Sequence, residues 1–399
     1  MINEKVKFNY DDVAIIPDIV TDIKSRKECN PLMEDGMSPI WAAPMDTVVN
    51  LDNWKTFYDA KVNVIIPRNV DLYERVKIMT DCSFIDSKYK PFVALSLAEA
   101  KSVFLEKDRF KNVRMRLEYN KDYLEEDSGL RYIMRICIDM ANGHMQEQIN
   151  TIKEIKDLYG ENVVIVGGNV GNPKTYELYD KAGCDYLRVS IGGGAGCLTA
   201  SNCAIHFPIF SLLEETYRLK QKIGGKCKII ADGGIKGFRD VQKALIFADC
   251  AMMGSVFNKA IESAGKTTYG SFYWNIRGKK IYRPIKTLLY YGREVPKEKY
   301  GEVVELIKGN KLSVWKEFYG MSTKKAQKSI LDGNGIRSKG NLKTSEGIIL
   351  HQKVEYSIMG WMRNEMDYLR SAMSYTNSRT LDEYKDSEYV VLNEINYNK

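Results

Sequence analysis

The chain has little of what zinc modules, disulfide frameworks and membrane spans are built from. Its 399 residues include only three histidines, and its eight cysteines show no C-x-x-C spacing. Structural zinc needs clustered Cys and His ligands, so a zinc module is not expected. No apolar run approaches the roughly 20 residues of a membrane helix, and the N-terminal segment lacks the apolar core of a signal peptide. These absences predict a soluble, cytoplasmic protein with reduced cysteines and no membrane contact.

Positive charge is concentrated late in the chain. Between Lys266 and Ser345 there are 18 Lys and Arg against 6 Asp and Glu, a net of +12, which leaves −5 for the rest of a chain of net charge +7. Residues 266–316 are also rich in tyrosine and tryptophan. This composition is compatible with a solvated insertion, with contacts to a small nucleotide, or with nucleic-acid binding. We favour the solvated insertion and consider nucleic acid the least favoured partner.

Short apolar runs alternate with helix-length spacers along the chain. Helical periodicity is clearest at 145–158, 173–181 and 210–222. Eight repeats of strand and helix favour a (β/α)8 TIM barrel over an open doubly wound sheet, whose glycine motif would lie near the N-terminus. The eight predicted strands are Ile40–Ala43, Val62–Ile66, Pro91–Leu97, Tyr132–Ile138, Val163–Val166, Tyr186–Val189, Lys228–Ala231 and Ala251–Met253.

The glycine loops after the later strands carry the predicted chemistry. S-I-G-G-G-A-G-C-L-T (Ser190–Thr199) ends in a cysteine, Cys197, and glycine lets a ligand approach the backbone closely. A thiol in such a loop can act as a nucleophile. A-D-G-G-I (Ala231–Ile235) and M-M-G-S (Met252–Ser255) follow at the next strand ends, where barrels commonly bind phosphate. The pattern predicts covalent chemistry on a phosphorylated substrate.

Further motifs lie before and after the glycine loops. They are F-N-Y-D-D-V-A-I-I-P (Phe8–Pro17), A-A-P-M-D-T-V (Ala42–Val48), C-I-D-M-A-N-G-H (Cys137–His144), V-G-G-N-V (Val166–Val170), F-Y-G-M-S (Phe318–Ser322) and S-E-G (Ser345–Gly347). Together with the Cys197 loop, A-D-G-G-I and M-G-S, these motifs resemble the IMP dehydrogenase/GMP reductase family over most of the chain.

Within that family, C-I-D-M-A-N-G and F-Y-G-M-S are similar to the reductase versions. The flap Arg-Tyr pair that dehydrogenases use to activate water is absent between Met321 and Glu346. Only residues 67–90 lie between the second and third strands, too few for the regulatory modules of typical dehydrogenases. The resemblance implies one catalytic barrel domain over residues 1–399, with an insertion and flap at about 266–347.

The resemblance also implies a mechanism. Cys197 forms a covalent adduct at C2 or C6 of a purine nucleotide, and Thr199 and Glu346 transfer protons. The implied activity is reduction of GMP, or a close analogue, to IMP and ammonia with NADPH. Substrate contacts are expected from Met45, Arg68, Ala195, Asp232, Gly233, Gly234, Gly254, Ser255, Tyr319, Gly320 and Met321.

The remaining implied sites concern the cofactor, a metal ion and assembly. Asp139, Ala141 and Asn169 match the positions at which the family binds its nicotinamide dinucleotide. The carbonyl groups of Gly192, Gly194 and Cys197 match a potassium loop, and carbonyl oxygens suit a hard cation. The resemblance further implies a homo-oligomer, a tetramer or octamer.

The chain departs from the family pattern around the nucleophile. Ala195 replaces a phosphate-contacting serine, Leu198 and Ala200 replace Thr and Arg, and Pro67-Arg68 replaces His-Lys. Arginine keeps the charge of lysine but not its capacity to transfer protons. Two other functions therefore stay open: IMP dehydrogenase activity, and a catalytically silent nucleotide-binding barrel.

Overall fold

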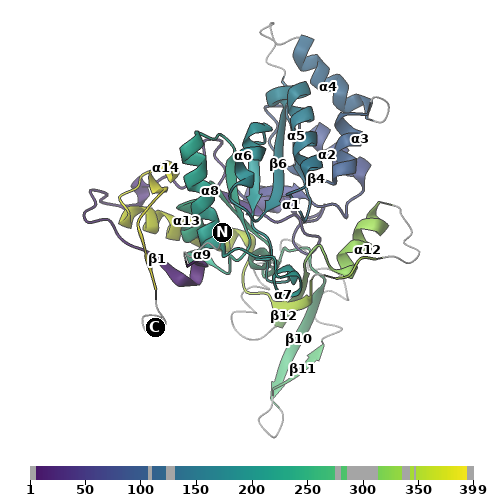
Figure 1. Cartoon of the computed structure of the whole chain (residues 1–399). Helices are drawn as coiled ribbons and strands as arrows, with labels where there is room; N and C mark the ends of the chain where they lie inside the picture. Colours follow the sequence, from purple (N-terminus) through teal and green to yellow (C-terminus); the bar gives the residue numbers. More distant parts are fainter. Residues whose placement is uncertain are drawn as a thin grey trace.

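Eight parallel strands close into a barrel in chain order (Figure 1). The computed structural model describes residues 6–106, 110–122, 131–274, 280–284, 313–334, 342–345 and 347–392. All eight predicted strands are present, so the TIM-barrel prediction is confirmed over the open sheet. The barrel strands are β2 (Ile40–Ala42), β3 (Asn63–Ile66), β4 (Phe92–Leu95), β5 (Met134–Ile138), β6 (Val163–Val170), β7 (Tyr186–Val189), β8 (Lys228–Asp232) and β9 (Cys250–Met253).

Helices between the strands form the outer layer. The predicted helices at 145–158, 173–181 and 210–222 are confirmed as α5, α6 and α8. Residues 98–130, for which no helix was predicted, contain most of α3 and all of α4. No helix within the described ranges is both long and apolar enough to cross a membrane. The helices up to the last barrel strand are α1 (Trp54–Asp59), α2 (Leu72–Asp81), α3 (Leu97–Phe104), α4 (Lys111–Asp122), α5 (Gln146–Tyr159), α6 (Thr175–Lys181), α7 (Thr199–Cys203), α8 (Ile209–Ile223) and α9 (Phe238–Leu245).

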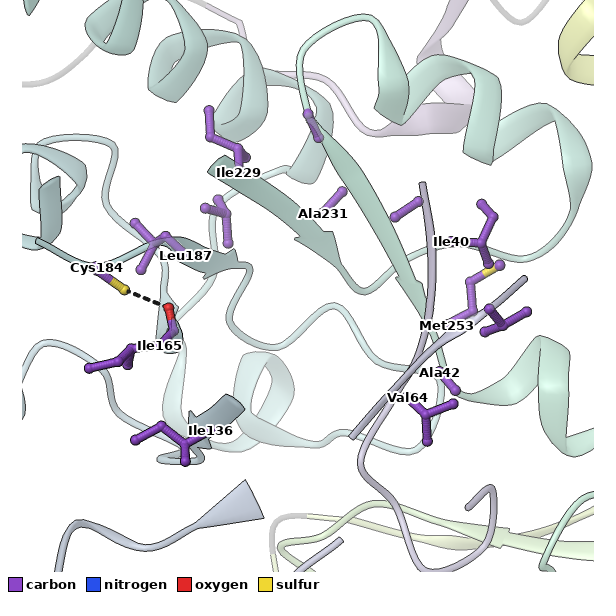
Figure 2. Close-up of a cluster of buried hydrophobic side chains, with 14 of the residues drawn as sticks. Ile40, Ala42, Val64, Ile136, Ile165, Cys184, Leu187, Ile229, Ala231 and Met253 are labelled. Atoms are coloured by element: carbon purple, nitrogen blue, oxygen red, sulfur yellow. Dashed lines mark hydrogen bonds between the residues drawn. The ribbon is translucent and has the colours of Figure 1, made fainter. Parts of the chain in front are cut away.

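The barrel wall is apolar on both sides, as expected for parallel strands covered by helices. Because side chains alternate along a strand, Ile40 and Ala42 belong to the layer under the helices, while Trp41 belongs to a second buried cluster inside the barrel. Figure 2 shows the layer under the helices. In the interior cluster the Trp41 ring lies 4.9 Å from that of Phe92 and 5.3 Å from that of Tyr186.

The chain returns to the barrel after the insertion and completes the helical layer. The short α10 (Ser255–Asn258) follows β9 and precedes the insertion. After the insertion, α13 (Ile358–Tyr375) packs against α1 and α9. Trp361 of α13 stacks on Phe238 at 4.9 Å and meets the edge of Phe257. The chain ends with α14 (Leu381–Tyr384) and with β14 (Tyr389–Val391), which pairs antiparallel with β1 (Val13–Ile15).

One carboxyl group is buried between α13 and α9. Glu365 of α13 is fully buried, and its Oε1 accepts a hydrogen bond from Nε2 of Gln242 on α9 at 3.2 Å. Neither Glu365 Oε2 nor Gln242 Oε1 has a partner among the described residues. Burial raises the pKa of Glu365 well above its usual value. A proton on Oε2 would supply a donor for the Gln242 oxygen, so a neutral carboxylic acid suits this position.

The insertion extends from the loop after the last barrel strand, at the carboxyl end of the barrel. Its described parts form a four-stranded antiparallel sheet in the order β11-β10-β12-β13, together with α12 (Lys324–Gly333). In Figure 1 the β10–β11 hairpin points away from the barrel. Much of the basic, aromatic 266–316 segment lies outside the described residues. The strands are β10 (Thr267–Trp274), β11 (Lys280–Pro284), β12 (Ser313–Tyr319) and β13 (Ile349–Lys353).

Candidate active site

A cavity of about 380 Å³ lies at the carboxyl ends of the barrel strands, under the insertion. This is the end at which TIM barrels bind their substrates. The sequence-predicted residues that line it are Met45, Arg68, Asp139, Ala141, Asn169, Gly192, Gly194, Ala195, Cys197, Thr199, Asp232, Gly233, Gly234, Gly254, Ser255, Gly320 and Met321. Tyr319 is not among the lining residues, and Glu346 lies outside the described part of the chain.

The loop after β7 holds the candidate nucleophile. Cys197 is partly buried, and its thiol donates a hydrogen bond to the Thr199 hydroxyl at 3.3 Å. The same loop packs on the loop after β8, where the Gly234 N–H donates to the carbonyl of Gly193 at 2.8 Å. A Cβ at Gly193 would lie 2.8 Å from the Ser190 hydroxyl of the same loop, which would have to turn away, and 3.5 Å from the Gly234 nitrogen of the other loop. The thiol and both glycine loops therefore face one cavity.

The flap strands close over the nucleophile loop. Gly347 forms a β-bridge with Cys197, and the Ile348 N–H donates to the Gly196 carbonyl at 3.1 Å. Phe318 of β12 lines the cavity beside them. The flap thus contacts the loop through main-chain hydrogen bonds, which fix the distance between the two segments.

A second contact joins the flap to the loop after β2. The Tyr319 hydroxyl donates to Asp46 Oδ2 at 3.0 Å. Burial raises the pKa of Asp46, although the bond from Tyr319 acts in the opposite direction, and burial likewise raises the pKa of Tyr319. Tyr319 therefore holds the flap in place instead of lining the cavity. The sequence motif A-P-M-D-T-V contained this aspartate but gave it no predicted role.

Sequence reasoning missed a charged cluster at the upper layer of the barrel interior. Arg188 lies on β7 and is almost fully buried, and it forms ion pairs with Asp139 and Asp232 at 2.7 and 2.8 Å. Burial by itself would lower the pKa of Arg188, but the two carboxylates raise it well above its usual value. The signal was a single arginine in the otherwise apolar strand Tyr186–Val189.

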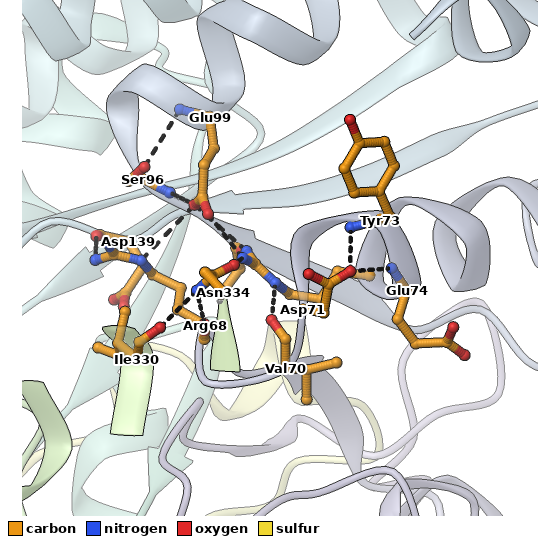
Figure 3. A network of polar contacts seen from close by, with 12 residues as sticks. Arg68, Val70, Asp71, Tyr73, Glu74, Ser96, Glu99, Asp139, Ile330 and Asn334 are labelled. Carbon is orange, nitrogen blue, oxygen red and sulfur yellow. Dashed lines mark hydrogen bonds and ion pairs between the residues drawn. The ribbon is translucent and has the colours of Figure 1, made fainter. Parts of the chain in front are cut away.

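Arg68 belongs to a second charged network that reaches the flap (Figure 3). Its Nη1 donates to the Asp139 carbonyl at 3.4 Å, and its Nε lies 3.9 Å from Glu99 Oε2. Glu99 also accepts a 2.7 Å bond from the buried Arg75, whose guanidinium donates to Asn334 at the end of α12. Burial would raise the pKa of Glu99, but the bond and charge of Arg75 lower it. Asn334 in turn donates to the Arg68 carbonyl at 3.1 Å, which ties α12 to the barrel.

The loops after β5 and β6 form the other side of the cavity. The Gly143 N–H donates to the Asn169 carbonyl at 2.8 Å. Beside them, Nε2 of His144 accepts from the Gly171 N–H, and its Nδ1 lies 3.0 Å from the Thr175 hydroxyl. Burial lowers the pKa of His144, which favours the neutral ring that this acceptor role needs. Asp139, directly after β5, and Asn169, near the end of β6, are thereby held on two cross-linked segments.

Comparisons with known proteins agree with this geometry. The family model described as "IMP dehydrogenase / GMP reductase domain" matches residues 131–305. A GMP reductase of Streptococcus gordonii is 31% identical over 308 residues, which cover 72% of this chain and 86% of that protein.

The chain belongs to the IMP dehydrogenase/GMP reductase family.

Other family members align over nearly the whole length. GMP reductases of Bacillus licheniformis and Staphylococcus aureus are 26% and 25% identical, and each alignment covers 96% of both chains. The protein is therefore a purine nucleotide oxidoreductase of this family.

Among the described residues there is no cluster of three or more His, Cys, Asp or Glu side chains suited to a metal ion.

Proposed function

We propose that this protein is a GMP reductase, which converts GMP to IMP and ammonia with NADPH. The observation that carries the proposal is the Cys197 thiol, which faces the cavity 3.3 Å from the Thr199 hydroxyl in a chain whose near full-length relatives are named GMP reductase. The absence of an Arg-Tyr pair between Met321 and Glu346 favours reduction over the dehydrogenase reaction.

The chemistry follows from the position of the amine. GMP carries its amino group on C2 and IMP carries hydrogen there, so C2 is the atom that Cys197 attacks. The sulfur–carbon bond forms as the carbon–nitrogen bond breaks, ammonia leaves, and hydride then displaces the sulfur. The balance is GMP + NADPH + 2 H⁺ → IMP + NH₄⁺ + NADP⁺, in which the nicotinamide supplies the hydride.

Proton transfer is assigned to residues beside the thiol. Thr199 is placed to relay a proton between the sulfur and the departing amine. Glu346 stays the proposed acid that protonates this amine, and it lies outside the described residues. Its chain neighbour Gly347 pairs with Cys197, which supports the assignment.

The nucleotide is proposed to span the loops after β8 and β9. Asp232 accepts from the ribose hydroxyls, while the main chain of Gly233, Gly234 and Gly254 and the hydroxyl of Ser255 bind the phosphate. The base is proposed to lie between the loop that carries the Cys197 thiol and the flap. The residues assigned to base and phosphate contacts there are Met45, Ala195, Gly320 and Met321. Tyr319, expected from the sequence to be a contact as well, is assigned the role of holding the flap through Asp46.

The dinucleotide is assigned to the opposite side of the cavity. The Asp139 carboxylate and the Asn169 side chain suit hydroxyl and amide groups, and Ala141 leaves room beside them. A methyl group on Gly143 would lie 2.6 Å from the Asn169 carbonyl, so Gly143 packs directly on the backbone that carries Asn169. Arg68 contributes a permanent positive charge at this end.

A potassium ion and a homo-oligomer remain part of the proposal. Gly192, Gly194 and Cys197 would present carbonyl oxygens to the ion. The Gly194 carbonyl already accepts the Cys197 N–H at 2.9 Å, which holds the loop in a turn. Titration of the activity with K⁺ tests the potassium site. Sedimentation of the full chain tests the assembly, for which we expect a tetramer or octamer.

The assay that tests the function uses GMP with NADPH. We expect loss of NADPH absorbance with equimolar ammonia release. NADH formation from IMP and NAD⁺, without reaction of GMP, would assign the dehydrogenase activity instead. Tight GMP binding with neither reaction would identify a silent nucleotide-binding barrel.

Substitution of Gly143 tests the dinucleotide wall. In Gly143→Ala the added methyl collides with backbone at Asn169 and Gly168, so these must move. Since small misplacements in active sites have large kinetic effects, we expect KM for NADPH to rise about tenfold and KM for GMP to change less. Gly237→Ala is the matched control, because a methyl there meets open space. Equal changes for both substrates would contradict the assignment.

Removal of the Tyr319 hydroxyl tests the flap contact. Tyr319→Phe leaves the partly buried Asp46 carboxyl without one of its donors, which costs about 1–3 kcal/mol in the closed flap. We expect KM for GMP to rise roughly fivefold or more while Tm stays within a few degrees. Tyr375→Phe, at an exposed tyrosine, is the control. An unchanged KM would show that this bond does not hold the flap.

A further inference from the structure

Arg188 joins two carboxylates that the proposed function assigns to different ligands. Its Nε and Nη2 both lie 2.8 Å from Oδ2 of Asp232, and its Nη1 donates to Oδ1 of Asp139 at 2.7 Å. Asn169 donates to the same Oδ2 of Asp232 at 2.7 Å. The other oxygen of each carboxylate, Asp232 Oδ1 and Asp139 Oδ2, receives no hydrogen bond from the described residues.

The backbone of the neighbouring strand packs closely against the main chain of Arg188. A side chain at Gly168 on the neighbouring strand would lie 2.6 Å from the Arg188 carbonyl and 3.0 Å from its Cβ, and Gly168 has a positive φ of 115°. Gly168 precedes Asn169, so the V-G-G-N-V motif provides both the close approach of β6 to β7 and a further donor to Asp232. The cluster is thus a built feature of strands β5 to β8.

A buried guanidinium between two carboxylates has a defined energetic role. Without the cation, two negative groups would face each other in a nearly dry site, where like charges repel strongly. With it, each carboxylate is held by one oxygen and exposes the other to the cavity. An oriented carboxylate oxygen is a strong acceptor for ribose hydroxyls.

We infer that Arg188 is a positioning residue that presents Asp232 to the nucleotide and Asp139 to the dinucleotide, so that one buried side chain serves both subsites. The inference rests on the proposed function. Its consequence is that a single substitution on β7 weakens both ligands, although they bind on opposite sides of the cavity. Arg188 is not proposed to touch the reacting atoms.

The test measures binding of GMP and of NADP⁺ separately, by calorimetry on the full chain. These two ligands do not react with each other, because NADP⁺ has no hydride to give. In Arg188→Met we expect both dissociation constants to rise about tenfold or more, because each carboxylate loses its counter-charge. Arg188→Lys keeps one charge but not the fork, so both constants should rise by a smaller and similar factor. If Arg188→Met does not fold, the lysine variant still tests the shared effect.

Crossed rescue separates positioning from general damage. In Arg188→Met/Asp139→Asn the repulsion on Asp232 is gone and Asn169 still donates to its Oδ2, so GMP affinity should recover in part while NADP⁺ affinity stays low. In Arg188→Met/Asp232→Asn the pattern should reverse. A merely structural role for Arg188 would give no such ligand-specific recovery, and its absence in folded variants overturns the inference.

A control substitution removes another partly buried ion pair from the same strand region. Lys156 pairs with Asp185, which directly precedes β7, at 2.9 Å and at the opposite end of the barrel. Lys156→Met should lower Tm without changing either affinity. If the wild-type protein binds neither GMP nor NADP⁺, the proposed function fails. If it binds both and Arg188→Met binds them equally well, only the inference about Arg188 fails.

Discussion

Replacement of Cys197 by alanine is expected to lower the rate of GMP reduction by about 10⁴-fold or more, as removal of other enzymatic nucleophiles does. The thiol is the only group in the loop that forms the proposed bond to C2, and no neighbouring side chain replaces it. GMP should still bind, because the phosphate and ribose contacts come from the loops after β8 and β9. Ammonia release and calorimetric GMP binding measure the two effects.

The control for this experiment is a second thiol six residues further on. Cys203 is exposed at the end of α7 and lines no part of the cavity. Cys203→Ala should keep full activity. Substantial GMP reduction by Cys197→Ala would refute a covalent mechanism, even if the family assignment stands.

The second large effect concerns stability and pH. Glu365 has a raised pKa in the folded protein because it is buried, and the ordinary value of about 4.5 applies when the chain unfolds. Below the ordinary pKa the carboxyl group is protonated in both states and its full contribution to stability is present. As pH rises, the unfolded chain loses its proton first, so stability falls until the folded pKa is passed.

Glu365→Gln removes this pH dependence. The amide keeps an acceptor for Gln242 and adds a donor for its unpartnered oxygen. We expect the variant to be more stable than the wild type by on the order of 1–3 kcal/mol at pH 8, with the difference shrinking toward pH 4. Urea unfolding at several pH values measures it. Glu355→Gln, at an exposed carboxyl group, should show no such trend. A variant less stable at pH 8 would contradict the neutral-acid interpretation.

The barrel itself was predictable because its signal is local. Each strand is a short apolar run, since both faces of a parallel barrel strand are buried, and Ile40 and Trp41 are both needed to fill the two sides of the wall. The glycine loops were also predictable. Glycines such as Gly193 and Gly194 let a ligand approach the backbone, and a cysteine in the same loop indicates a nucleophile. Placement of these loops on one cavity then followed from the strand order.

The charged clusters were not predictable in the same way. Arg188 stood out only as one charge in an apolar strand, and nothing in the sequence marked Glu99 or Asn334. The partners of all three lie on other strands and helices. A buried charge depends for its stability on the groups that surround it, and these are brought together only by the closed barrel. The helix at 324–333 was likewise not predicted, and Asn334 at its end bonds to Arg68 and Arg75, which lie far away in the chain.

By itself, the sequence determined the barrel, the order of its strands and the loop that holds Cys197. Short apolar runs specify strands and glycines specify tight loops through interactions within a few residues of chain. Only the tertiary structure decided that Arg188 joins Asp139 to Asp232, that Tyr319 binds Asp46 and that Gly347 pairs with Cys197. These contacts depend on distances between segments far apart in the chain, and those distances are fixed only when the barrel closes and the flap docks on it.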